Sequence, residues 1–479
     1  MAPVPAASSS ARRAEGAGKP FAGGGRRAPD VATSQKPGGS RGKAKTSAAA
    51  ARGRTGGSTR RTGAVPKAGS KRRVALPAAR VAEERRDRRT GRSGGKSRAA
   101  SVSGKGSDSR VDLARSSSAG VEPAYFVLVP TAALLLMGLV MVFSAGSIIG
   151  MGQNIGAYRY FTQQLIWACL GLGLMIFFWK FDYHKLGKIS WVGVIVSIVL
   201  LGLVPFYGWA AYGSRRWLSL GPINIQPTEI AKFTLVVFSA YVLAMKGDRL
   251  KQAFHLVVPV VLVAVIEAGL ILRQPDLGSA LVLCFSVMLL LVMAKTKASH
   301  LAVMGAVGGS AALFFAVSAP YRRARLFSFI DPWKTPRGAG YQVIQSYIAL
   351  GSGNIKGLGL GMSRQKFLYL PNAHTDFIFA IIGEELGLIG TMVVLVLIGL
   401  LAYGGLRIAS RAPDELGKLL AAGITGLIVI QAIVNMGGVT GLLPITGVPL
   451  PLVSSGGSSL CVCMACIGIL LNIAAQRSR

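Results

Sequence analysis

Residues 376–406 read "DFIFAIIGEELGLIGTMVVLVLIGLLAYGGL". This apolar run exceeds the roughly 20 residues that a helix needs to cross a bilayer. Three carboxylates, those of Asp376, Glu384 and Glu385, stand at or near its start. Ionisable groups are costly at membrane depth and usually serve a function there. The run therefore predicts a membrane-spanning helix with chemistry near one end.

Similar runs recur along the chain, which is 51% hydrophobic with a mean hydropathy of +0.48. Few soluble proteins of this size are so apolar. The expected spans are residues 124–148, 161–179, 189–207, 229–245, 255–272, 279–294, 300–319, 376–406, 417–437 and 456–474. We predict an all-α integral membrane fold with ten transmembrane helices and a long extracytoplasmic loop, residues 321–375, before the eighth.

The first 120 residues have a different composition from the rest of the chain. They hold 28 Lys and Arg against 7 Asp and Glu, with almost no aromatic residues. Such a segment buries too little apolar surface to fold, so residues 1–120 are predicted to be a disordered basic tail before a membrane domain, residues 121–479. The tail either attracts anionic lipid or an acidic partner, with nucleic acid the weaker option, or only sets the topology.

The short loops that alternate along the chain indicate the orientation. Residues 180–188, 246–252, 295–299 and 407–418 are all rich in Lys and Arg. By the positive-inside rule these loops and both termini are expected in the cytoplasm. Long loops escape this rule, so the basic residues within 321–375 do not change the prediction.

Two outer segments carry an unexpected excess of positive charge. Arg215 and Arg216 lie in the first, and the long loop 321–375 holds Lys366 among eight basic residues. Arginine forks suit phosphate, so a basic outer loop favours an anionic ligand. Attraction to the headgroups of the outer leaflet is the alternative interpretation.

Asp376 is the carboxylate nearest to this basic loop. We expect the helix to begin near His374 or Thr375, with Thr375 or Asp376 as its N-cap and with Asp376 above a strip of glycines on one face. Glu384 would lie about 12 Å further along the axis, too far for an acid–base pair. A single carboxylate among cations suits the removal of a proton from a hydroxyl that attacks a carbon bearing a phosphate leaving group.

Other polar residues within the spans have plainer interpretations. Glu229 and Lys232 share a helix face, so they either neutralise each other or serve a function at membrane depth. Glu384 and Glu385 are expected to pair with cations of neighbouring spans. Cysteines 461, 463 and 466 stand in an apolar run without His or carboxylate partners, so neither a metal site nor a disulfide is predicted.

Four segments together resemble a known family. They are "GSRRWLSLGPINIQPTEIAK" (213–232), "RQPDLGSALV" (273–282), "LYLPNAHTDFIFAIIGEELGLIG" (368–390) and "GLLPITGVPLPLVSSGGSS" (441–459). They are similar, in the same order, to the signature segments of the SEDS (shape, elongation, division and sporulation) family. The stretch around Asp376 resembles the division branch more than the elongation branch.

The resemblance implies a bacterial enzyme of the plasma membrane, at the division septum, that polymerises lipid II into peptidoglycan strands. The catalytic aspartate of the family falls on Asp376, and undecaprenyl pyrophosphate would be the leaving group. The implied partners are a class B penicillin-binding protein, other division proteins and membrane lipids. The candidate substrate-binding residues are Arg215, Arg216, Lys232, Lys366, His374, Glu384 and Glu385.

Two departures from the family pattern bear on the site. Asn372 stands where the family often has Glu, which weakens the implied divalent cation, Mg²⁺ or Mn²⁺, and leaves its ligands unknown. Ser455 stands where Tyr is common. The rival functions are a lipid II flippase or other transporter, an elongation-type polymerase, and a non-catalytic division scaffold.

Overall fold

The computed structural model describes residues 122–152, 156–211, 214–221, 223–246, 257–367 and 369–476. The predicted tail, residues 1–120, lies outside these described residues, so its boundary with the membrane domain stays a prediction.

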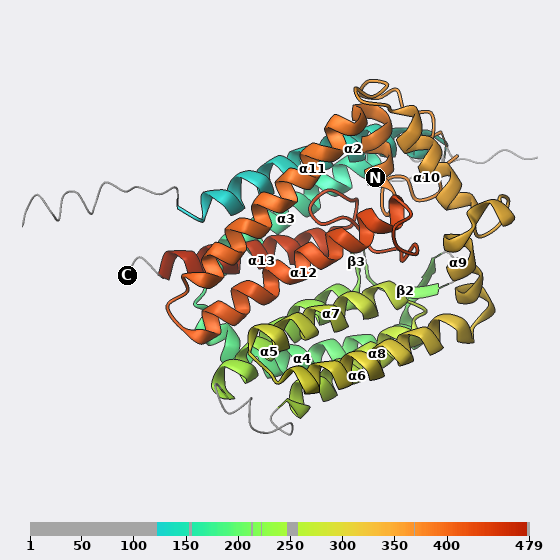
Figure 1. The fold of residues 1–479 in the computed structure, drawn as a ribbon. Helices are drawn as coiled ribbons and strands as arrows, with labels where there is room; N and C mark the ends of the chain where they lie inside the picture. The colour runs from blue at the N-terminus through green and yellow to red at the C-terminus, as the bar shows by residue number, and fades with distance from the viewer. Residues whose placement is uncertain are drawn as a thin grey trace, which may run out of the picture. The chain divides into compact units, whose positions relative to one another are not determined.

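Long apolar helices make up most of the described chain (Figure 1). Among the described residues, eight helices are long and apolar enough to cross a membrane. They are α2 (Tyr125–Gly152), α3 (Arg159–Lys180), α4 (Tyr183–Tyr207), α5 (Pro227–Lys246), α8 (Ala298–Ser318), α11 (Ile378–Ser410), α12 (Glu415–Val439) and α13 (Gly457–Gln476). The predicted all-α membrane fold is confirmed.

The remaining two predicted spans correspond to shorter helices. α6 (Val258–Arg273) and α7 (Leu277–Met293) have 16 and 17 residues. Residues 274–276 alone separate them, because Asp276 caps α7 by accepting a hydrogen bond from the Ser279 amide at 3.1 Å. A total of ten crossings therefore stays a prediction.

α12 lies at the centre of the helix packing. It packs against α5, α7 and α11, while α3 lies along α13 and α2 along α11. Small residues allow these close approaches: a side chain at Gly423 of α12 would meet Leu290 of α7 at 2.8 Å. In contrast, α8 has no buried residue.

The outer segments are more structured than the sequence indicated. Three strands form an antiparallel sheet in the order β1 (Trp209–Ala211), β2 (Ser214–Leu220), β3 (Ile223–Ile225), which was not predicted. The predicted loop 321–375 is largely helical in its first half. It contains most of α9 (Pro320–Ile330), the 3₁₀ turn η3 (Pro332–Lys334) and α10 (Tyr341–Ser352).

The predicted start of the eighth span was wrong. α11 begins at Ile378, its N-cap is Phe377, and no side chain caps it. The expected glycine strip is also absent, because Gly387 has φ 67° and ψ −161° and interrupts the helix. Asp376 therefore belongs to the loop that precedes the helix.

The outer loop fills the interruption in α11. The amides of Leu358 and Gly359 donate to the carbonyl oxygens of Glu384 and Glu385, each at 3.0 Å. On the other side of Gly387, the amide of Leu388 donates to the carbonyl oxygen of Asn354 at 2.9 Å. Backbone groups freed by the break are thus satisfied by the loop, as burial requires.

Candidate functional site

The turn that carries Asp376 is organised by Asn372. Its carbonyl oxygen accepts hydrogen bonds from the amides of Thr375 and Phe377 at 3.1 and 3.3 Å. The φ of Asn372 is 57°, in the left-handed region that Asn tolerates better than most residues. Asn at position 372, where the resembled family often has Glu, is therefore compatible with the geometry of the turn.

The segment before α13 holds the same turn from the other side. The Ser455 amide donates to the carbonyl oxygen of His374 at 3.0 Å, and the Ser454 hydroxyl to that of Thr375 at 2.7 Å. The Asn435 amide group, from α12, donates to the carbonyl oxygen of Asp376 at 2.8 Å. Three consecutive carbonyl groups are thus anchored, which fixes where the Asp376 side chain begins.

The Asp376 carboxylate and the Arg216 guanidinium lie beside the same glycine. A methyl group placed on Gly447 would be 3.5 Å from Asp376 Oδ2 and 3.8 Å from Arg216 Nη1. Arg216 Nη2 also donates to the carbonyl oxygen of Pro275 at 2.6 Å, and Nη1 lies 4.0 Å from Asp276 Oδ1. The structure therefore brings Asp376 and Arg216 together, with β2 as the support for the arginine.

The protein around Asp376 favours the neutral form of its carboxyl group. Burial raises the pKa of Asp376 from 3.8 to about 6, while the charges of Arg216 and Arg325 lower it and that of Asp276 raises it. The effect of desolvation on this pKa is larger than the opposing effect of the two arginines. A pKa near 6 suits a base that must be ionised yet proton-accepting near neutral pH.

His374 lies two residues before Asp376 in the chain, and its surroundings favour the neutral imidazole. Burial lowers the pKa of its imidazole from 6.5 to about 4. Its ring lies 4.8 Å from that of Tyr160 in α3, and its Nδ1 is buried with no hydrogen-bond partner among the described residues. His374 can therefore orient a neutral polar group but cannot supply positive charge.

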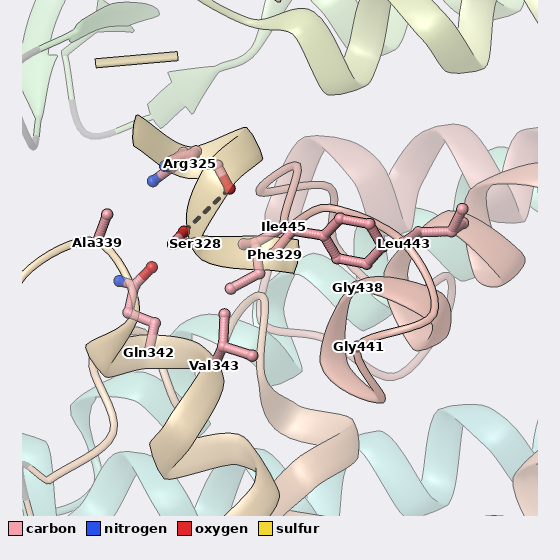
Figure 2. Close-up of a pocket in the computed structure, with 10 residues that line it drawn as sticks. All are labelled: Arg325, Ser328, Phe329, Ala339, Gln342, Val343, Gly438, Gly441, Leu443 and Ile445. Atoms are coloured by element: carbon pink, nitrogen blue, oxygen red, sulfur yellow. Dashed lines mark hydrogen bonds between the residues drawn. The ribbon is translucent and has the colours of Figure 1, made fainter. Parts of the chain in front are cut away.

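A small pocket adjoins the site (Figure 2). Arg325 and Ser328 of α9 and Gln342 of α10 provide its polar lining, and Gly438 and Ile445 also line the hollow beside Asp376. Arg325 was one basic residue among several in the sequence, and the fold is what places its charge within reach of Asp376.

Lys366, Glu384 and Glu385 form a separate buried cluster at the break in α11. Lys366 Nζ lies 2.9 Å from Glu385 Oε1, and the Ser144 hydroxyl of α2 donates to the same oxygen at 2.7 Å. Glu384 accepts hydrogen bonds from the Ser363 hydroxyl and from the Arg364 amide, the latter at 2.9 Å. These side chains are occupied inside the protein, so the expected direct contact with substrate has no support from their geometry.

The expected pairing of the two glutamates with cations of neighbouring spans was also wrong. The cation that pairs with Glu385 is Lys366, from the loop 321–375. Among the described residues, Glu384 is held by loop hydrogen-bond donors and by no cation.

Lys232 is equally enclosed. Its ammonium lies 2.8 Å from Glu229 Oε1, which confirms the predicted pair, and donates to Gln431 Oε1 at 2.7 Å. Arg215, by contrast, is exposed and donates to the carbonyl oxygen of Pro205 at 3.1 Å. Of the predicted substrate-binding residues, Arg216 therefore lies beside Asp376. His374 belongs to the same turn, but its ring lies against Tyr160, and the others have different surroundings.

The residues around Asp376 do not fit a divalent cation held by the protein. Both oxygens of Asp276 already accept hydrogen bonds from Ser279, at 3.1 and 2.8 Å. Within the described ranges, no group of three His, Cys, Asp or Glu side chains has a metal-binding arrangement. The adjacent Arg216 and Arg325 favour an anion instead. The expectation of Mg²⁺ or Mn²⁺ stays untested.

Comparisons with known proteins agree with this architecture. A family model described as "Cell cycle protein" matches residues 125–479. "Stage V sporulation protein E" of Bacillus subtilis is 38% identical over 353 residues, covering 73% of this chain and 96% of that protein. "Probable peptidoglycan glycosyltransferase FtsW" of Geobacter metallireducens is 39% identical over 353 residues, covering 73% of this chain and 94% of that protein.

A solved structure is similar as well. It is described as "Structural coordination of polymerization and crosslinking by a peptidoglycan synthase complex" and is 29% identical, with a TM-score of 0.60. The match covers 74% of this chain and 97% of that one.

Proposed function

Since the chain belongs to the SEDS family of cell cycle proteins, which includes the FtsW relatives, we propose that it is a peptidoglycan glycosyltransferase that polymerises lipid II during septal wall synthesis. The observation that carries this proposal is one carboxylate close enough to two arginines for their charges to act on it. Asp376, with its pKa raised to about 6, lies in the field of Arg216 and Arg325 at the outer end of the helices.

In this mechanism Asp376 is the general base. It accepts the proton of the sugar 4-hydroxyl of the acceptor lipid II as that oxygen bonds to the anomeric carbon of the donor. The bond between this carbon and the pyrophosphate oxygen breaks, and undecaprenyl pyrophosphate leaves with the electron pair. Arg216 and Arg325 would stabilise the charge that develops on the leaving group, because preorganised cations cost no reorganisation during the reaction.

The anchored backbone supports this assignment. Asn435, Ser454 and Ser455 hold the carbonyl groups around Asp376, so the carboxylate needs little reorientation to meet a hydroxyl. His374, neutral at physiological pH, would donate to or accept from a sugar group without competing for the pyrophosphate.

The cellular setting follows from the same proposal. The chain would act in the bacterial plasma membrane with both termini cytoplasmic, as the basic short loops favour. A class B penicillin-binding protein would cross-link the strands. Topology is checked by labelling single cysteines placed in residues 407–418 and in β2, and a labelled 407–418 in intact cells would contradict the orientation.

The decisive assay follows strand formation from labelled lipid II in detergent, with the penicillin-binding protein present. Asp376→Asn and Asp376→Ala should each lose about 10²–10⁴-fold in rate, as loss of a general base typically does. Asp331→Asn, a partly exposed outer carboxylate paired with Lys334, is the matched control and should keep its activity.

The assay in detergent also distinguishes a polymerase from a flippase, because lipid II in detergent reaches the site without crossing a bilayer. Normal strand formation by a folded Asp376→Asn variant would show that Asp376 is not the general base. Absence of strands with the native protein, together with lipid II transport across vesicles, would favour the transporter.

A further inference from the structure

α9 starts at the membrane surface because it follows a membrane-spanning helix directly. α8 ends at Ser318 and α9 begins at Pro320, so Ala319 alone joins them. In Figure 1, α9 turns sharply away from the direction of α8. A helix of 11 residues is about 16 Å long, so no part of α9 lies further than about that distance from its start beside the end of α8.

The two faces of α9 have different surroundings. Arg325 and Ser328 face the small pocket beside the candidate site. On the opposite face lie Arg323, Phe327 and Ile330, spaced i, i+4 and i+7 along one stripe. Phe327 is 60% exposed and Ile330 70% exposed.

The turn η3 follows α9 in the chain, with Asp331 alone between them. Trp333 is 65% exposed there and adds a third large apolar side chain. Residues 320–340 contain five basic residues and one acidic residue, Asp331, which lies 3.3 Å from Lys334. Arg323 and Arg337 are both exposed, so the segment that carries the apolar side chains also presents positive charge.

The first arginine of α9 is directed back to α8. Arg322 donates to the Ser318 hydroxyl at 3.2 Å, and its guanidinium carbon lies 6.0 Å from the centre of the Phe315 ring. This contact fixes the turn between the two helices and keeps the start of α9 close to the membrane.

We propose that the exposed face of α9 and η3, made by Arg323, Phe327, Ile330 and Trp333, lies in the outer lipid–water interface and binds anionic phospholipid headgroups. Helices that lie in this plane combine large aromatic and aliphatic side chains with Lys and Arg, as this surface does. Aromatic rings are favoured at headgroup level, and the flanking arginines complement lipid phosphates. A protein partner on this face is the competing possibility, and continuity with α8 favours lipid.

Spin labels test this directly. The exposed Cys169 and Cys284 are replaced by Ser, and a label is attached at Phe327→Cys or, separately, at Ile330→Cys. The protein is placed in nanodiscs of phosphatidylcholine, with or without phosphatidylglycerol. Relaxation by dissolved oxygen is compared with relaxation by a water-soluble nickel chelate, calibrated with spin-labelled lipids. A protein that retains Cys169 alone, near the middle of α3, provides the reference for a label in hydrocarbon.

At both positions oxygen should relax the label more than nickel does, and phosphatidylglycerol should increase this preference. Replacing Arg323, Lys334 and Arg337 together by Gln should abolish the increase. If the nickel chelate relaxes these labels as strongly as it relaxes a label in water, both with and without phosphatidylglycerol, the proposal is wrong. Labels that become protected only when the penicillin-binding protein is added would also overturn it. An oxygen preference that does not respond to phosphatidylglycerol would overturn the recognition of anionic headgroups.

Discussion

The ammonium of Lys366 lies 2.9 Å from a carboxylate oxygen of Glu385, and both side chains are buried. Lys366 comes from the outer loop and Glu385 from α11, just before the break at Gly387. The ammonium also donates to the Gly361 carbonyl oxygen at 2.6 Å and to the Ser144 hydroxyl at 3.0 Å. One charge pair thus ties the loop that leads to Asp376 to two membrane helices.

Removing one of these two charges while keeping the other should destabilise the protein strongly. Lys366→Met leaves the Glu385 carboxylate buried without a counter-charge, which typically costs about 3–5 kcal/mol. Thermal unfolding in detergent measures the loss. Lys334→Met is the control, because Lys334 pairs with Asp331 at the surface, with 80% of the lysine side chain exposed, and should change stability by less than about 1 kcal/mol.

A double replacement separates charge from packing. Lys366→Met with Glu385→Gln removes both charges, so its cost should be smaller than the sum of the two single costs. Additive costs would show that the two charges do not interact.

The break in α11 should depend on glycine at its centre. At Gly387, φ is 67° and ψ is −161°, and a Cβ would lie 2.5 Å from the carbonyl oxygen of Ile355. Gly387→Ala should therefore cost several kcal/mol, about 1–3 for the backbone alone, and displace the loop that crosses it.

The matched control lies in the same helix. A Cβ at Gly399 meets no atom within 4 Å, so Gly399→Ala should be neutral or stabilising by up to about 1 kcal/mol. Equal melting temperatures for the two variants would contradict the proposed constraint.

The long apolar helices were predictable because a chain in lipid must satisfy its backbone hydrogen bonds within each segment. The Glu229–Lys232 pair was predictable for a similar reason, since both residues lie three positions apart on one helix. Such local rules depend on neighbours along the chain.

The geometry of the site depends on contacts between residues far apart in the sequence, which local sequence rules do not predict. Ser144 and Glu385 are 241 positions apart, and Asn435 reaches Asp376 from α12. The helix start was misplaced because the Asn372 carbonyl oxygen accepts a hydrogen bond from the Phe377 amide, which a cap at Thr375 would have used. Gly447 lies within a segment that resembled the family, yet its place beside Asp376 and Arg216 became evident only from the fold.

The raised pKa of Asp376 predicts a pH-dependent stability. Since the folded state raises this pKa from 3.8 to about 6, it binds the proton more tightly than the unfolded chain. The resulting stabilisation is complete below about pH 4 and is lost as the pH rises through about 6.

Asp376→Asn removes this dependence. At pH 8 the variant should be more stable than the native protein by up to roughly 3 kcal/mol, and near pH 4 the difference should disappear. Melting curves in detergent from pH 4 to 8 measure it. A variant that is less stable than the native protein at pH 8 would contradict the raised pKa.

Arg216 should set the pH at which the enzyme loses activity. Its charge lowers the pKa of Asp376, so Arg216→Gln should raise that pKa further above its value of about 6. The acidic limb of the pH profile of kcat/KM reports this ionisation in the free enzyme and should move to higher pH. The variant should also bind the pyrophosphate group less well, which lowers the rate at every pH.

Arg215 provides the neighbouring control. It stands next to Arg216 on β2 but is exposed, and its guanidinium donates to the carbonyl oxygen of Pro205 instead. Arg215→Gln should leave the acidic limb where it is in the native enzyme. A limb that moves equally in both variants would mean that the general field of the outer face, rather than the Arg216 charge beside Gly447, governs the carboxylate. An unmoved limb in Arg216→Gln, with the rate lowered at every pH, would leave this arginine a role in binding the leaving group but none in tuning the base.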